Sequence, residues 1–193
     1  MHGDKEIEHY DKDFSNITYE GKLVKDRFFD TCRFYGSNLK ECMFEDCHFE
    51  NCTFINCDIS LLRFKRTQFN GIKIDNSKAI GITWQDADNP LNLEFSNTNL
   101  SYSSFYGKNL RKINITDSVA HDVDFANCNL SAANFSGTDL LNARFVNTDL
   151  SLANFTDAIN YTINIQENNI KKAKFKLPEA LSLLQSLNII LLE

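Results

Sequence analysis

A period of five residues constrains this chain more than any other feature of its sequence. Between Ala133 and Phe155 it reads ANFSGTDLLNARFVNTDLSLANF, in which a small residue, then Asp, Asn or Arg, then Leu or Phe recurs at every fifth position. A helix face repeats about every 3.6 residues and a strand face about every 2, so neither amphipathic pattern accounts for this spacing. The period therefore predicts a repeat architecture.

The same frame extends through most of the chain. The large apolar position recurs every fifth residue from Phe14 to Trp84, shifts by one residue, and recurs again from Phe95 onward. Of the 16 phenylalanines, all but Phe28 occupy it. Because one large and one small residue per repeat can fill a narrow shaft, we expect both positions to point inward. The small position, two residues before the large one, holds every cysteine: Cys32, Cys42, Cys47, Cys52, Cys57 and Cys128.

These residues make the chain resemble the pentapeptide repeat family, whose motif A(D/N)LXX is matched nearly to the letter from Asn127 to Phe155. The resemblance covers residues 13–175 and implies an all-β solenoid, a right-handed quadrilateral parallel β-helix with four pentapeptides to a coil. At a strand spacing of ~4.8 Å, about eight coils would make a rod roughly 40 Å long. Residues 1–12 are polar, and we expect them to form an N-terminal arm or cap. The frame shift at residues 85–92 predicts a bulge or short loop.

Residues 176–193 leave the repeat and predict a C-terminal helix followed by a short strand. Pro178 suits the first helical turn and Glu179 complements the helix dipole, while apolar residues recur at helical spacing. Residues 189–192 are four consecutive large aliphatic residues and predict the strand. A chain end this apolar also predicts a homodimer. The expected dimer interface consists of Leu177, Leu181, Leu184, Leu187, Ile189 and Leu191.

The tail and the first repeats are similar in pattern to the Qnr quinolone-resistance proteins, mycobacterial MfpA and the McbG microcin-immunity protein. This resemblance implies a dimer joined through the C-terminal helix and strand. It also implies a DNA-mimicking protein that binds a type II topoisomerase, gyrase or topoisomerase IV, and protects it from a quinolone or a topoisomerase toxin. Qnr proteins of the Gram-negative type carry long loops that contribute to protection, whereas this chain has only the short bulge at residues 85–92.

Acidic residues concentrate in the second half of the chain. The net charge is -6, and residues 86–157 alone contain nine acids against four bases. An acidic rod about as wide as a duplex resembles DNA to a DNA-binding protein, whereas the scarcity of clustered cations disfavours direct nucleic-acid binding. Outward acids also keep repeat proteins soluble, so charge alone does not decide between these interpretations. The predicted partner-binding surface consists of Asp86, Asp88, Glu94, Asp117, Asp122, Asp124, Asp139, Asp149 and Asp157.

Catalysis, cofactors and metals are disfavoured by the residue pattern. None of the four histidines has a nucleophile or carboxylate at a motif-like distance, and no glycine-rich phosphate loop is present, so we predict no catalytic residue and no cofactor. Cysteines five residues apart would point to different walls of the shaft, so we expect them to fill the core of a protein in a reducing compartment, without a metal. No apolar run reaches the ~18 residues of a membrane span, and we expect a cytoplasmic protein.

Two hypotheses of different class follow from the sequence. The first is the DNA-mimicking dimer that binds a type II topoisomerase, with outward acids meeting the surface that normally holds DNA. The second is a generic protein–protein interaction scaffold with no topoisomerase role, because a flat-sided repeat rod can bind many partners.

Overall fold

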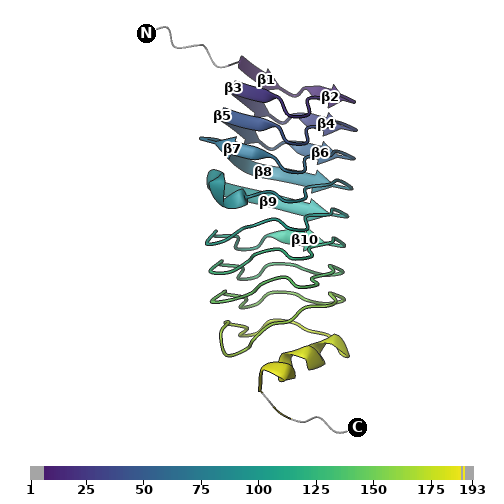
Figure 1. Cartoon of the computed structure of the whole chain (residues 1–193), viewed down its shortest axis with the longest axis vertical. Coiled ribbons are helices and arrows are strands. Elements are labelled where there is room, and N and C mark those ends of the chain that lie inside the picture. The colour runs from purple at the N-terminus through teal and green to yellow at the C-terminus, as the bar shows by residue number, and fades with distance from the viewer. Residues whose placement is uncertain (1–6, 188, 190–193) are drawn as a thin grey trace.

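The computed structural model describes residues 7–187 and residue 189, and shows a β-solenoid of stacked coils (Figure 1). All strand pairs are parallel within this described part, and Phe14 lies beside Phe34, which lies beside Phe54. One coil therefore takes four pentapeptides, as the period predicted. The elements are β1 (Ile7–Tyr10), β2 (Asp13–Ser15), β3 (Leu23–Asp30), β4 (Arg33–Tyr35), β5 (Met43–Glu50), β6 (Thr53–Ile55), β7 (Arg63–Lys65), β8 (Gln68–Asp75), η1 (Trp84–Asp86), β9 (Asp88–Ser96), β10 (Asn114–Thr116) and η2 (Glu179–Leu187).

The shaft is filled as the repeat frame requires. Along one wall the rings of Phe29 and Phe49 stack 4.7 Å apart, and those of Phe49 and Phe69 stack 5.1 Å apart. All six cysteines are buried and free, and burial raises the pKa of the Cys52 thiol to about 12. A thiol in this environment stays protonated and packs as a small apolar side chain. The predicted inward positions are confirmed.

The corners of each coil depend on left-handed backbone. The second residue after the large position has a positive φ, for example 54° at Asn56 and 50° at Asp117. Asn, Asp and Gly tolerate this conformation better than other residues do, which explains why they recur at the corners. The three remaining positions of each pentapeptide therefore face solvent at an edge or in the middle of a flat side.

The four flat sides are numbered here by the bridge residues that stack along each one. Face 1 carries Thr18, Asn38, Asp58, Lys78, Asn99, Val119, Asp139 and Ile159. Face 2 carries Met43, Arg63, Thr83, Ser104, Asp124 and Arg144. Face 3 carries Gln68, Asp88, Asn109, Asn129, Asp149 and Asn169. Face 4 carries Glu94, Asn114, Asn134, Asn154 and Lys174.

The first coil begins earlier than the sequence indicated. Residues 7–10 were expected in a polar arm, but β1 pairs with β3 and places His9 opposite Phe29, with the two rings stacked 4.9 Å apart. His9 precedes Phe14 by five residues and so occupies the large position. Because histidine is polar, the apolar pattern of the sequence did not identify it as part of the repeat. Residues 1–6 lie outside the described part of the chain.

The C-terminal helix is a 3-10 helix, Glu179–Leu187, that lies across the last coil (Figure 1). Leu183 packs against the shaft and so covers part of its end. The expected strand at residues 189–192 falls almost wholly on residues outside the described part of the chain.

The frame shift forms a local distortion, as expected. After Trp84 the chain makes the 3-10 turn η1 and enters β9 with register shifts against β8, where Gln68 pairs with Asp88 but Phe69 pairs with Leu91.

A second irregularity occurs where the frame weakens at Asn160. Here Asn160 is exposed, and the neighbouring Tyr161 is buried against Phe155 instead.

Candidate functional site

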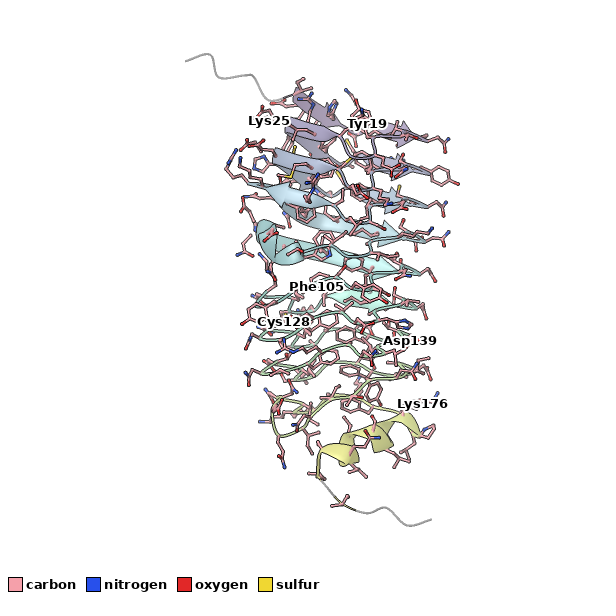
Figure 2. All side chains as sticks on the ribbon, in the orientation of Figure 1. Tyr19, Lys25, Phe105, Cys128, Asp139 and Lys176 are labelled. Atoms are coloured by element: carbon pink, nitrogen blue, oxygen red, sulfur yellow. The ribbon has the colours of Figure 1, made fainter. Side chains whose placement is uncertain are left out.

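The outward surface is where this molecule can meet a partner. Among residues 7–187 and 189, no group of three His, Cys, Asp or Glu side chains is arranged to hold a metal ion. No helix in the same residues is long and apolar enough to cross a membrane. The side chains on the outside of the coils are drawn in Figure 2, and they include all nine acids of the predicted partner-binding surface.

The nine predicted acids do not form one surface, because the repeat distributes them over all four sides. Asp124 lies on face 2, Asp88 and Asp149 on face 3, and Glu94 on face 4, while Asp86 belongs to η1. The other four share face 1 and its two edges in the second half of the rod. We call these four the acidic face: Asp117, Asp122, Asp139 and Asp157.

Asp139 lies on face 1 between Val119 and Ile159, in the C-terminal half of the rod (Figure 2). Its Oδ2 lies 2.8 Å from Nε2 of His121, and its Oδ1 accepts a 2.8 Å hydrogen bond from Nδ2 of Asn160. Partial burial alone would raise the pKa of Asp139, but the hydrogen bonds from Asn160 and His121 outweigh it and hold that pKa below its usual value. His121 has no carboxylate at a motif-like distance in the sequence, but successive coils bring it to Asp139, 18 residues away.

Residues at equivalent positions of successive coils form a column along the rod. Asp117 and Asp157 lie in one such column, along an edge of face 1, with Gly137 between them. Backbone bonds join the column, from Asp117 N to Ser136 O and from Gly137 N to Thr156 O. The carboxylate of Asp117 lies over Gly137, in space that a side chain there would occupy. Asp157 forms a 2.6 Å ion pair with Lys176, which offsets its charge.

Asp122, on the opposite edge of face 1, is exposed and has no ion pair within the described residues. Asp124, by contrast, lies 3.1 Å from Arg144 on face 2. The last coil also brings Lys174 to face 4, which adjoins face 1, and Lys171 and Lys172 follow Asn169 of face 3. Of the nine acids of the predicted partner-binding surface, four therefore lie on face 1 and its two edges within the described residues.

The predicted dimer residues form an exposed apolar stripe on η2. A 3-10 helix has about three residues per turn, so Leu181, Leu184 and Leu187 lie in one row. Leu181 is 48% exposed and Leu187 38% exposed, while Leu184 is half-buried. Leu177 precedes η2 and Ile189 follows it, and they are 70% and 51% exposed; Leu191 lies outside the described residues.

These features define a class of protein: a β-solenoid of five-residue repeats with a packed interior and flat polar sides. The sequence model for pentapeptide repeats matches eight copies, over residues 32–71, 94–131 and 121–157. The chain belongs to the pentapeptide repeat family. No curated protein matches the sequence significantly.

Solved structures show the same fold. Two trypsin-treated variants of QnrB1, a plasmid-mediated fluoroquinolone resistance protein, superpose with TM-scores of 0.55 at 18% and 20% identity. Each match covers 96% of this chain and 98% of the other. HetL, a pentapeptide repeat protein of Nostoc sp. strain PCC 7120 involved in heterocyst differentiation regulation, matches at 14% identity and a TM-score of 0.42, over 88% of this chain and 85% of its own.

Proposed function

We propose that this protein is a DNA mimic that binds DNA gyrase or topoisomerase IV through the acidic face and protects the enzyme from fluoroquinolones or a topoisomerase toxin. The observation that carries the proposal is the gathering of four aspartates on face 1 and its two edges, with Asp139 held in place by His121 and Asn160. The fold shared with QnrB1 along nearly the whole chain supports it.

The number of carboxylates per length of the acidic face can be compared with the number of phosphate charges per length of duplex DNA. Asp117 and Asp157 are two coils apart, or ~10 Å at strand spacing. The four carboxylates of the acidic face fall within that span, whereas ~10 Å of duplex DNA carries about six phosphate charges. The pairing of Lys176 with Asp157 lowers the protein's density further. Competition with DNA would thus depend on the rigid placement of the carboxylates and on a second subunit.

A dimer through η2 would supply that second subunit. The row of Leu181, Leu184 and Leu187 is apolar and exposed at the end of the rod, and a two-fold axis there would bury it against its own copy. Two acidic faces would then lie on one rod of twice the length. In this proposal the dimer occupies the DNA-binding surface of the topoisomerase while the drug or toxin is present, and in this way it protects the enzyme.

A gyrase supercoiling assay with and without ciprofloxacin tests the function. The wild-type protein should restore supercoiling in the presence of the drug. A variant with Asp117→Asn and Asp122→Asn should lose this effect, while the matched pair Asp30→Asn and Glu50→Gln, outside the acidic face, should retain it. Absence of any effect of wild-type protein, with or without drug, would instead favour a protein–protein interaction scaffold with another partner.

Sedimentation tests the dimer separately. Leu184→Asp places a charge in the apolar row and should yield a monomer, because an unpaired carboxylate at an apolar interface is costly. The circular dichroism spectrum should remain that of the wild type, since η2 lies outside the shaft. A wild-type protein that sediments as a monomer at micromolar concentration would exclude this interface.

A further inference from the structure

The two ends of the rod are closed to different extents. At the C-terminal end η2 lies across the last coil, and Leu183 packs against the shaft (Figure 1). At the N-terminal end the large-position residues Phe14 and Val24 are only half-buried, and they line a pocket of about 530 Å³. Tyr19 and Lys25, which also line this pocket, lie near the N-terminal end of the rod (Figure 2). Within the described part of the chain, the interior is therefore accessible from this end.

Two departures from the repeat pattern shape this pocket. Val24 is paired with Phe44, which is paired with Phe64, so a smaller residue stands where the next two coils have a ring. Arg27 is paired with Cys47 and so occupies the small, inward position of the repeat. Its side chain is half-buried and lines the pocket. The first coil thus combines an incompletely filled interior with a cation at an inward position.

The lining of the pocket is apolar and positively charged. It consists of ten apolar or aromatic residues and three basic ones, His9, Lys25 and Arg27, and no carboxylate belongs to it among the described residues. Nη1 of Arg27 donates to the backbone oxygens of Lys25 at 2.6 Å and Asp26 at 3.1 Å, and Arg27 makes no ion pair with a described residue. A half-buried cation without a carboxylate partner favours the binding of an anion.

His9 contributes a neutral ring to this lining. The ring stacks 4.9 Å from that of Phe29, and Nζ of Lys12 lies 3.2 Å from its Nδ1. Burial, followed by the charges of Lys12 and Arg27, lowers the pKa of His9, so the ring is neutral at neutral pH. The positive charge of the pocket therefore resides on Arg27 and on Lys25, which lies 4.0 Å from Glu45.

These properties fit a small molecule that has a long apolar part and one anionic group. Small-molecule sites of this volume are mostly apolar, with a few polar groups that fix the orientation of the ligand. The planar guanidinium of Arg27 matches a carboxylate, which can accept two hydrogen bonds from it. Phe14, Phe34 and Phe44 supply aromatic surface for an alkyl chain. A peptide fits less well, because its polar backbone groups would be buried against these rings without partners.

We propose that this pocket is a binding site for an alkyl monocarboxylate of the fatty-acid class. The carboxylate contacts Arg27 and Lys25, and the alkyl chain lies against the aromatic residues at the end of the shaft. The site lies at the opposite end of the rod from η2, and it does not depend on the proposed topoisomerase function.

Isothermal titration calorimetry of the full chain with decanoate tests the proposal. Decanoate should bind about ten-fold more tightly than octanoate, because each buried methylene group strengthens binding by about three- to four-fold. Decanol and decyltrimethylammonium have the same alkyl chain without the carboxylate and should bind more weakly. Absence of decanoate binding, or equal binding of decanoate and the cationic amphiphile, would overturn the proposal.

Charge variants test the role of Arg27. Arg27→Gln should weaken decanoate binding by about ten-fold, the scale of a hydrogen bond to a charged group. Arg33→Gln is the matched control, because Arg33 lies in the next coil, 3.7 Å from Asp13, and does not line the pocket. It should leave decanoate binding unchanged. If Arg33→Gln weakens binding as much as Arg27→Gln does, decanoate responds to net charge alone and the proposed site is wrong.

A filling variant tests whether the alkyl chain enters the pocket. Val24→Phe places in the first coil the ring that Phe44 and Phe64 supply in the next two. It should weaken decanoate binding by at least about ten-fold, while the urea unfolding midpoint stays at or above that of the wild type. Wild-type affinity in a folded Val24→Phe protein would show that the alkyl chain binds elsewhere and would exclude the site.

Discussion

The two halves of the rod share one kind of interior but hold their outward carboxylates differently. In the first half, Glu45 contacts Lys65 at 2.7 Å and Arg66 at 2.9 Å, so these two cations neutralise its negative charge. In the second half, Asp124 and Asp157 are paired with cations, but Asp139 and Asp149 accept hydrogen bonds from the neutral amides of Asn160 and Asn169. An amide fixes the orientation of a carboxylate without neutralising it. The second half therefore retains negative charge that a partner can use.

The largest effect should come from the interior, where the halves are expected to behave alike. Phe54→Ala in the first half and Phe135→Ala in the second each remove a fully buried ring and should each cost ~3 to 5 kcal/mol through the cavity that remains. Urea unfolding at equilibrium measures both. A large cost in one half and a small cost in the other would show that the shaft is not uniform.

A smaller effect should distinguish two corners of the second half. Gly137 and Gly107 have φ values of 68° and 71°, so alanine at either position should cost about 1 kcal/mol in backbone strain. At Gly137 the new methyl group must also displace the carboxylate of Asp117, whereas nothing lies near it at Gly107. We expect Gly137→Ala to be the more destabilising of the two in urea. Equal costs would mean that Asp117 moves aside freely and is not fixed by its column.

The smallest effect should come from Asp139→Asn, which removes the charge paired with His121 but leaves an oxygen for Asn160. At neutral pH it should cost less than about 1 kcal/mol. Because the folded pKa of Asp139 is lowered, its stabilising effect is present above the unfolded pKa and is lost as the pH falls through the folded value. Wild type and variant should therefore converge in stability in acid. Asp122→Asn, which removes the same charge from a residue with no ion pair among the described residues, is the control for net charge.

Sequence periodicity determined much of this structure because the interior of a repeat rod is strictly periodic. The positions of Phe54, Cys52 and the other shaft residues followed from the frame alone. The site was less accessible to prediction. Which acids share a side depends on counting columns around four faces, and the nine predicted acids turned out to be distributed over all of them.

Other features could not be read from composition because they depend on exceptions to the frame. His9 fills a large position with a polar ring, and a 3-10 helix replaces the expected helical spacing at the tail. At the distorted coil, the amide of Asp86 bonds to Thr83 within the turn, and the carbonyl of Ala87 accepts the ammonium of Lys108, so bonds that join the coils elsewhere are replaced there. Only Pro90 and the frame shift were visible in the sequence, and neither alone indicates which bonds are lost.

The interrupted bonds also bear on how the rod would come apart. In a solenoid, each coil gains most of its stability from the coil on either side, so unfolding spreads from neighbour to neighbour. Across the distorted coil backbone bonds remain on other faces, such as that from Trp84 N to Ser104 O at 2.8 Å, and the rings of Trp84 and Phe105 stack 6.0 Å apart, but bonds on face 3 are missing among the described residues. This junction is a natural boundary between two cooperative units. Amides on its two sides should then exchange with solvent as separate groups, one for each half of the rod.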